Sequence, residues 1–274
     1  MLARIESTLA EAGIETAARE ARWLLEAATG ERITELYAKS EELPGPVVER
    51  AVELTGRRVS GAPLQYVTGV AGFRRLELAV GPGVLIPRPE TEVVAERAIQ
   101  RLPSRGIIVD VGTGSGAIAL SIADERPDAR VYGTEISETA IEWAQRNVST
   151  LRLSIELVRG DLFDGLPPEL AGEVDVVVSN PPYVAVGDAD ALPTEVVDHE
   201  PAEALFAGEE GLQVIADIAM RAREWLRPGG WLILEIGFAQ SEAVLRLLTN
   251  HDYAQVAAHP DLSGHLRVAE GRHR

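Results

Sequence analysis

The segment 179–183, Ser-Asn-Pro-Pro-Tyr, carries the most specific chemical signal in this sequence, and it directly follows the apolar run 174–178. Its two prolines have no N–H, so the loop presents carbonyl oxygens, the Asn180 amide and an aromatic face in a rigid arrangement. The Asn180 side-chain oxygen and the Pro181 carbonyl can each accept one N–H, while the Tyr183 ring packs against the plane of the bound group. Prolines that only ended a strand would need neither the asparagine nor the tyrosine. We therefore predict a site for a planar NH2 group, with catalytic residues Asn180, Pro181 and Tyr183 and substrate-binding residues Asn180, Pro181, Pro182 and Tyr183.

A glycine-rich loop, Gly-Thr-Gly-Ser-Gly over residues 112–116, follows the apolar run 107–111 and precedes a predicted helix that starts near Ala117. Glycine lets the backbone approach a ligand closely, and the N-terminus of a helix favours negative charge. The same glycines also fit a dinucleotide-binding loop or a packing turn, so the loop alone does not identify its ligand. The cofactor-binding residues predicted in and before this loop are Asp110, Gly112, Thr113, Gly114, Ser115 and Gly116.

Carboxylates that follow the next two apolar runs narrow the choice of ligand. Glu135 follows the run 130–134, where a carboxylate is the expected partner of two ribose hydroxyls, so it indicates an adenosyl ligand. Asp161 could accept a hydrogen bond from an adenine amino group, with Leu162 and Phe163 flanking the ring, although an aspartate is also common in turns. Together with Asn180, these residues complete the predicted cofactor site.

The elements that must position these loops form a regular pattern from Thr91 onward, where helical segments alternate with short apolar strands. Such alternation predicts a mostly parallel sheet covered by helices on both faces. Two final runs, 255–258 and 265–269, are joined by a turn too short to cross a sheet, so they should pair antiparallel at its edge. Ligands bind at the carboxyl ends of the strands in such sheets. The other predicted strands span residues 107–111, 130–134, 155–158, 174–179 and 230–237.

The first 89 residues have a different character. Residues 1–62 carry apolar side chains at helical spacing and glycines placed as helix stops, so we predict a small helical bundle. Residues 63–89 mix β-type runs, 64–68 and 76–80, with glycine and proline, which predicts a β-hairpin and a linker. The remaining residues, 90–274, form the predicted catalytic domain.

Composition excludes several classes of function. The 274 residues contain no cysteine, which excludes disulfide scaffolds and thiolate nucleophiles, and the five histidines show no ligand pattern, so we expect no metal. We find no signal peptide and no apolar run long enough for a membrane span, so we expect a cytoplasmic protein. The formal net charge is −17. Residues 1–80 contain 12 acidic and 10 basic side chains, and residues 81–274 contain 31 acidic and 16 basic side chains. An acidic catalytic domain disfavours a large footprint on nucleic acid.

Several further segments, taken with these two loops, make the chain similar to the peptide chain release factor glutamine methyltransferase family (the HemK/PrmC type). The most discriminating of them is Ile-Pro-Arg-Pro-Glu-Thr-Glu over residues 86–92. The others are Leu-Gln-Tyr-Val-Thr-Gly at 64–69, His-Glu-Pro at 199–201, Gly-Leu at 211–212, Pro-Gly-Gly at 228–230, Glu-Ile-Gly at 235–237 and Asp-Leu-Ser-Gly-His-Leu-Arg at 261–267.

The resemblance implies an α/β fold in which a seven-stranded class I S-adenosylmethionine-dependent methyltransferase domain, Rossmann-like, follows a helical substrate-recognition domain and a β-hairpin linker. It implies S-adenosyl-L-methionine as cofactor. The implied substrate is the side-chain amide nitrogen of the glutamine in the Gly-Gly-Gln motif of bacterial peptide chain release factors. Arg88 would then lie near the mouth of the active site and bind substrate, or it would pair with Glu90 or Glu92 and brace the linker. We expect a monomer that binds neither nucleic acid nor membrane directly.

The chain departs from the family pattern at three positions. Glu135 stands where many members have aspartate, Leu162 where some have an aromatic residue, and Gly72 where an acidic residue is usual. None of these changes removes a catalytic group. They affect the expected stacking of adenine and the details of the hairpin.

Other functions fit parts of the same pattern. Methylation of an exocyclic amine of adenine or guanine in DNA or RNA would use the same 180–183 loop, but it requires a flipped base and basic groups that hold the backbone. An NAD-linked dehydrogenase fits the glycines and leaves the 180–183 loop unexplained. A non-catalytic adaptor that still binds the cofactor would be expected to have lost the Asn-Pro-Pro-Tyr sequence of the 180–183 loop, whereas this chain retains it.

Overall fold

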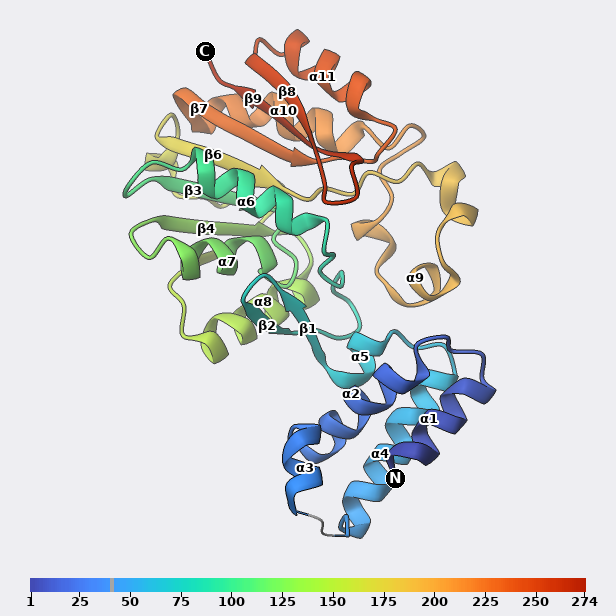
Figure 1. The fold of residues 1–274 in the computed structure, drawn as a ribbon. Helices are drawn as coiled ribbons and strands as arrows, with labels where there is room; N and C mark the ends of the chain where they lie inside the picture. Colours follow the sequence, from blue (N-terminus) through green and yellow to red (C-terminus); the bar gives the residue numbers. More distant parts are fainter. Residues whose placement is uncertain (40–41) are drawn as a thin grey trace.

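The computed structural model describes residues 1–39 and 42–274. Figure 1 shows a group of helices at the N-terminus, a two-stranded hairpin beside it, and an α/β domain built on one larger sheet. This arrangement confirms the predicted fold class. Within the described residues, every helix is too short or too polar to cross a membrane.

The N-terminal helices form a bundle with its own apolar core. Ile5 and Leu9 of the first helix are spaced four residues apart and are fully buried against Leu24 and Leu54 of two others. Residues at this spacing share one face of a helix, so burial of that face holds the bundle together. Gly30 ends the second helix with φ of 72°, a conformation that glycine adopts without a steric penalty. The helices are α1 (Leu2–Glu11), α2 (Ala17–Thr29), α3 (Ile33–Lys39), α4 (Gly45–Val59) and α5 (Leu64–Thr68).

Helix α5 corrects one prediction, because residues 64–68 were expected to form a strand. Pro63 precedes the segment, and Gly69 follows it with φ of 79°, the left-handed conformation that commonly ends a helix. Leu64 and Val67, three residues apart, both pack into the core of the helical bundle. A strand would have turned these two side chains to opposite faces, so the tertiary packing selects the helix.

The hairpin consists of β1 (Val70–Phe73) and β2 (Leu76–Ala79), which pair antiparallel. It is attached firmly to the catalytic domain. Arg74, at the turn, forms ion pairs with Glu96 and Glu125, and the Asn147 side chain bonds both the N–H and the carbonyl of Ala79. The hairpin was therefore predicted correctly in kind, but it begins later in the sequence than expected.

The main sheet has the strand order β5-β4-β3-β6-β7-β9-β8. The first five strands in this order are parallel, and β9 is antiparallel to both β7 and β8. The predicted antiparallel edge is thus confirmed. The strands are β3 (Ile107–Val111), β4 (Arg130–Glu135), β5 (Glu156–Arg159), β6 (Val174–Ser179), β7 (Leu226–Glu235), β8 (Ala254–Pro260) and β9 (Leu266–Arg272).

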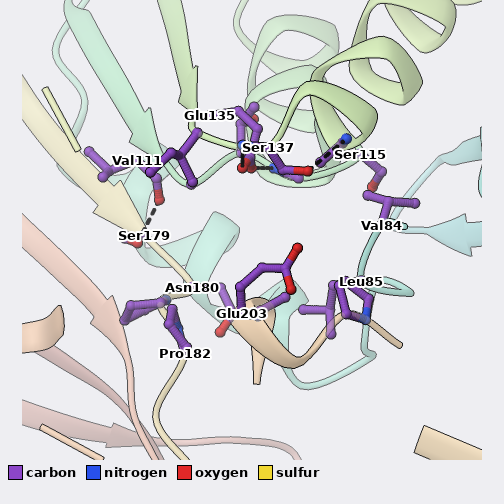
Figure 2. Close-up of a pocket in the computed structure, with 18 of the residues that line it drawn as sticks. Val84, Leu85, Val111, Ser115, Glu135, Ser137, Ser179, Asn180, Pro182 and Glu203 are labelled. Atoms are coloured by element: carbon purple, nitrogen blue, oxygen red, sulfur yellow. Dashed lines mark hydrogen bonds between the residues drawn. The ribbon is translucent and has the colours of Figure 1, made fainter. Parts of the chain in front are cut away.

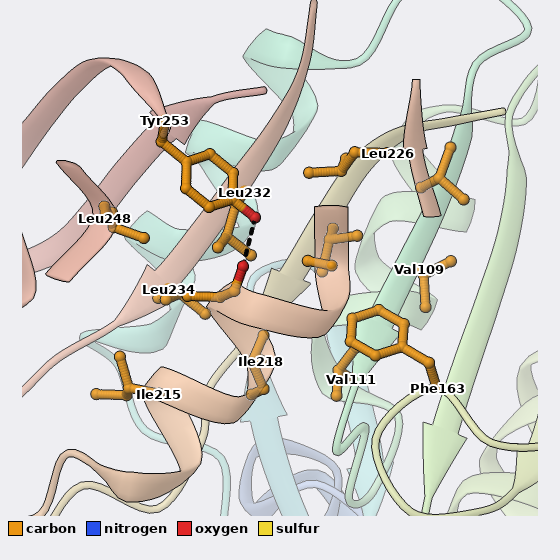
Figure 3. Close-up of a cluster of buried hydrophobic side chains, with 14 of the residues drawn as sticks. Val109, Val111, Phe163, Ile215, Ile218, Leu226, Leu232, Leu234, Leu248 and Tyr253 are labelled. Carbon is orange, nitrogen blue, oxygen red and sulfur yellow. Dashed lines mark hydrogen bonds between the residues drawn. The ribbon is translucent and has the colours of Figure 1, made fainter. Parts of the chain in front are cut away.

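Helices cover both faces of this sheet because its central strands are apolar on both sides. In β6, Val177 packs into the cluster under α10 and α11, shown in Figure 3, while Val176 and Val178 pack into the cluster under α6 and α7. Full burial of one such side chain stabilises the fold by about 1.5–3 kcal/mol. The helices of this domain are α6 (Thr91–Arg101), α7 (Ala117–Glu125), α8 (Glu138–Leu151), α9 (Thr194–His199), α10 (Gln213–Trp225) and α11 (Ser241–Asn250), with short 3-10 turns at Pro168–Leu170, Val186–Ala191 and Ala202–Ala204.

The position of the functional loops follows from the strand order. From β3 the chain runs outward through β4 to β5 and then returns to place β6 on the other side of β3. Loops that leave β3 and β6 in opposite directions open a crevice at the carboxyl edge of the sheet, which is where ligands bind in open α/β sheets. Both loops singled out in the sequence leave from this point.

Candidate active site

A cavity of about 330 Å³ lies at the carboxyl ends of β3, β4 and β6, as Figure 2 shows. Its size falls in the range of small-molecule sites, which are about 300–1,000 Å³. The structure brings most of the predicted site residues to it: Gly112, Thr113, Gly114, Ser115, Glu135, Asp161, Leu162, Asn180, Pro181 and Pro182 line the cavity.

The glycine loop offers its backbone to the cavity. Gly112 and Gly114 have φ of 70° and 58°, and both line the cavity. A Cβ atom added at Gly112 would meet no atom within 4 Å, and one at Gly114 would meet only Val84, at 3.9 Å. Side chains there would occupy the space that a ligand needs. Gly116 differs, because a Cβ atom would lie 2.8 Å from Leu120, so this glycine serves packing and does not line the cavity.

Asp110 does not line the cavity, which differs from its predicted role in holding the cofactor. Its side chain is buried beneath the glycine loop, where Oδ2 accepts hydrogen bonds from the Thr113 hydroxyl at 2.6 Å and from the Ala119 N–H at 3.1 Å. Burial raises the pKa of Asp110 to about 7, and the nearby charge of Glu135 adds to the shift. The residue therefore shapes the loop from behind.

Glu135 occupies the position expected for a ribose-binding carboxylate. It ends β4, lines the cavity and accepts backbone N–H groups on both oxygens, from Gly114 at 2.9 Å and from Ser137 at 2.9 Å. Each carboxylate oxygen has a second lone pair, so these bonds orient the group and leave acceptor capacity for a ligand. Asp161 and Leu162 line the cavity just beyond β5, the next strand in the sheet.

The loop after β6 is held by bonds to neighbouring elements. The Ser179 hydroxyl donates to the Val111 carbonyl at 2.6 Å, which ties the ends of β6 and β3 together. The Asn180 Nδ2 group donates to the Thr91 hydroxyl at 3.2 Å, at the first residue of α6. Among the described residues, no hydrogen bond to the Asn180 Oδ1 oxygen is formed, so this oxygen is free to accept one from a ligand.

Tyr183 was predicted to bind the substrate, and it is not among the residues that line the cavity. The ring packs against the apolar cluster beneath α10, and its hydroxyl donates to Glu235 Oε1 at 3.2 Å. The Tyr183 carbonyl accepts a hydrogen bond from Gln240 at 2.9 Å. Burial raises the pKa of the Tyr183 hydroxyl far above its usual range, so the group stays neutral and acts as a donor. Its role as a platform for the substrate remains a prediction.

Arg88 pairs with neither of its predicted partners. Its guanidinium lies 2.5 Å from Glu200, a buried carboxylate that also accepts the Ile86 N–H at 3.2 Å. Glu92 instead accepts the backbone N–H of Arg74. Arg88 thus joins the segment before α6 to the chain that follows α9, and it stands outside the residues that line the cavity.

Several lining residues were not predicted. Figure 2 shows the Glu203 carboxylate directed into the cavity from the chain after α9, on the side opposite Glu135, with Leu85 beside it. The segments 86–92 and 199–201 had already contributed to the family resemblance, but no spacing in the sequence indicated which of their neighbours enter the site. Within residues 1–39 and 42–274, no three acidic or histidine side chains gather where they could hold a metal ion.

Comparisons with known proteins agree with this geometry. Residues 1–69 match the PrmC N-terminal domain, and residues 91–210 match the methyltransferase small domain. The chain is 40% identical to a release factor glutamine methyltransferase of Geobacter sulfurreducens, covering 96% of this chain and 92% of that protein. This chain belongs to the release factor glutamine methyltransferase family. A relative with the same description from Streptomyces coelicolor is 40% identical over 99% of this chain and 96% of its own.

Solved structures support the fold of this family member. A methyltransferase from Pyrococcus furiosus superposes with a TM-score of 0.55 at 19% identity, covering 82% of this chain and 98% of its own. A 16S rRNA N2 G1207 methyltransferase from T. thermophilus, solved with AdoMet and guanosine, has a TM-score of 0.55 at 23% identity and covers 75% of this chain and 50% of its own. At this level of identity the likeness concerns the fold alone.

Proposed function

We propose that this chain transfers a methyl group from S-adenosyl-L-methionine to the side-chain amide nitrogen of the glutamine in the Gly-Gly-Gln motif of bacterial release factors. The observation that carries the proposal is Asn180, whose Nδ2 group is held by Thr91 and whose Oδ1 oxygen has no partner among the described residues of the cavity. Family membership supplies the substrate class, because relatives that match nearly the whole chain are described as release factor glutamine methyltransferases. A substrate of this class supports a cytoplasmic location for the proposed activity.

The residues that line the cavity fit S-adenosyl-L-methionine. The open space in front of Gly112 and Gly114 admits a ligand against the backbone, and the Glu135 carboxylate has acceptor capacity for two ribose hydroxyls. Asp161 and Leu162 would hold the adenine ring. When bound, the sulfonium supplies an electrophilic methyl group.

The chain itself has to orient a weak nucleophile, because the lone pair of an amide nitrogen is delocalised. The Asn180 side-chain oxygen and the Pro181 carbonyl can each accept one N–H of the target amide. Together they would hold the amide plane so that the nitrogen faces the donor. Alignment of two bound reactants can lower a barrier by as much as about 7–11 kcal/mol.

Methylation of a nucleic-acid base is the competing function, since an exocyclic amine presents the same NH2 group. A base in a duplex has to be flipped out and its backbone held by basic residues. Residues 81–274 hold 31 acidic and 16 basic side chains, which opposes such contacts. The relatives that cover nearly the whole chain also carry descriptions that point to a protein substrate.

Methyl transfer from labelled S-adenosyl-L-methionine tests the proposed function. Intact release factor should become labelled on the Gly-Gly-Gln glutamine, as mapped by peptide mass spectrometry. A release factor whose Gly-Gly-Gln glutamine is replaced by alanine should stay unlabelled, as should DNA and ribosomal RNA. Label on either nucleic acid, with none on the release factor, would overturn the proposal.

We expect Glu135→Ala to weaken S-adenosyl-L-methionine binding at least about tenfold, because loss of a hydrogen bond to a charged group costs about 1.5–3 kcal/mol. The change also removes the acceptor of the Gly114 and Ser137 N–H groups, so the glycine loop loses part of its support. Isothermal calorimetry gives the dissociation constant directly. Glu138→Ala, an exposed glutamate at the start of α8, serves as the control. An unchanged dissociation constant in Glu135→Ala would reject the assignment.

A further inference from the structure

A buried carboxylate lies behind the Asn-Pro-Pro-Tyr loop and has no role in the function described so far. Glu235 ends β7 and is fully buried, yet among the described residues no arginine or lysine forms an ion pair with it. Its Oε1 atom accepts the Tyr183 hydroxyl at 3.2 Å, and its Oε2 atom has no hydrogen-bond partner in the described structure. A buried charge without a counterion destabilises a fold by several kcal/mol, so its presence calls for a reason.

Thr91 connects this carboxylate to the site. Its side chain is buried at the start of α6, and its hydroxyl accepts the Asn180 Nδ2 group at 3.2 Å. The same hydroxyl lies near Glu235 and lowers its pKa, but no hydrogen bond between the two side chains is present in the described structure. We take Thr91 as the donor that Oε2 lacks. One carboxylate then supports both Asn180, through Thr91, and Tyr183, directly.

We propose that Glu235 is a positioning residue that acts through the Thr91 hydroxyl to hold the Asn180 carboxamide with its oxygen toward the target amide. An ionised carboxylate can only accept hydrogen bonds, so a hydrogen bond between the two side chains requires Thr91 to donate its single proton to Glu235. The Thr91 oxygen is then an acceptor, and only the NH2 end of Asn180 can face it. The inference rests on the proposed function, because it explains how the substrate-facing oxygen of Asn180 is selected.

A neutral Glu235 would remove this selection. A protonated carboxyl can donate to Thr91, and the hydroxyl could then donate to the oxygen end of Asn180. The Asn180 carboxamide would rotate by half a turn and direct its NH2 group toward the N–H groups of the target amide. Both groups are donors, so no hydrogen bond could form between them. Turnover should therefore depend on the ionised form of Glu235.

The surroundings of Glu235 set the pH at which this change occurs. Burial and the charge of Glu90 raise the pKa of Glu235, Thr91, Tyr183 and Arg267 lower it, and the net result is a pKa of about 7. These are the groups that face the carboxylate from α6, from the loop after β6 and from β9. Because the ionised form of Glu235 is the active one, kcat should fall as the pH decreases below about 7. In the Glu235→Gln variant, the acidic limb of the profile of kcat against pH should be absent.

Four full-length variants test the inference. Thr91→Val keeps the shape of the side chain and removes the hydroxyl, Thr91→Ser keeps the hydroxyl, Glu235→Gln removes the charge, and Glu242→Gln, an exposed glutamate on α11, is the matched control. Thr91→Val and Glu235→Gln should lower kcat on release factor at least about tenfold, whereas the dissociation constant of S-adenosyl-L-methionine should change by less than about twofold. Thr91→Ser should recover most of the activity that Thr91→Val loses, and Glu242→Gln should match the wild type.

Three outcomes would overturn the inference: a kcat of Thr91→Val close to that of the wild type, a loss of cofactor affinity as large as the loss of kcat, or an acidic limb that persists in Glu235→Gln. If Glu235→Gln does not fold, as judged by thermal melting, the comparison of Thr91→Val with Thr91→Ser decides the question. Methylation of the release factor by the wild type tests the proposed function separately, so failure of the two ideas can be told apart.

Discussion

Replacing Asn180 by alanine should lower kcat on a release factor by about 10²- to 10³-fold, the range seen when one preorganised polar contact to a reacting group is removed. Asn180 is placed to accept an N–H of the target through an oxygen that no other described residue uses, and Pro181 alone cannot fix the amide plane. The effect on stability should be small, because the side chain makes a single hydrogen bond, to Thr91, with a net contribution of about 1 kcal/mol. Turnover should therefore fall far more than the free energy of unfolding.

Single-turnover methylation and urea unfolding measure these two effects in the same preparations. The cofactor dissociation constant provides the internal control, since it separates loss of binding from loss of orientation. Asn180→Asp is an informative companion, because it keeps an oxygen but has no NH2 group to donate to Thr91. If Asn180→Ala retained a kcat within about threefold of the wild type, the amide clamp would be wrong.

Removing residues 1–62 should lower kcat/KM for intact release factor at least about a hundredfold, because two linked contacts bind with a high effective concentration. These residues form a bundle with an apolar core separate from that of the catalytic domain, as expected of a docking module. Its links to the catalytic domain include the Arg58 ion pair with Glu195, at 2.9 Å. Binding energy from such a remote contact can be used to position the reacting glutamine.

The deletion should stop before α5, because α5 and the hairpin form hydrogen bonds and ion pairs with the catalytic domain, even though Leu64 and Val67 of α5 also pack into the core of the helical bundle. The Tyr66 hydroxyl donates to the Val84 carbonyl beside the cavity, and Arg74 and Asn147 fasten the hairpin to the helices of that domain. Calorimetry with S-adenosyl-L-methionine should confirm that the truncated chain keeps its cofactor affinity.

A short Gly-Gly-Gln peptide distinguishes recognition from support of the fold. The peptide cannot reach the helical bundle while its glutamine is bound, so its kcat/KM should fall much less than that of the intact release factor. Equal losses on peptide and protein would mean that the bundle only supports the catalytic domain, and its role in recognition would be abandoned. The full-length Glu195→Gln variant shows whether the ion pair with Arg58 contributes on its own, because it leaves the Arg58 ion pair with Glu20 in place.

Local patterns in the sequence were sufficient for the fold class and for the position of the main loops. Apolar strands alternate with helices after residue 90, and this order leaves few arrangements other than a parallel sheet covered on both faces. The glycine loop and the Asn-Pro-Pro-Tyr loop each follow a strand, so both had to lie at the same edge. Glu135, Asp161 and Leu162 line the cavity for the same reason.

Only the tertiary structure decided what the side chains around these loops contact. Residues 64–68 have β-type composition but form α5, because Leu64 and Val67 bury on one face of it. The partners of Arg88 and Asn180 lie 112 and 89 residues away in the chain. Packing also brought the Tyr183 hydroxyl to Glu235, and it placed Asp110 beneath the glycine loop.

The physical reason lies in the range of the interactions. Some patterns act within a few residues and can therefore be recognised from the sequence alone. They are the alternation of side chains along a strand, the spacing of apolar residues in a helix, and the effects of proline and glycine. The direction of a buried hydrogen bond depends on which distant groups fill the same space and on the charge they carry there. Asn180 could therefore be recognised from its loop alone, whereas its connection to Glu235 through Thr91 required three separate elements, β6, α6 and β7, to be brought together by the fold.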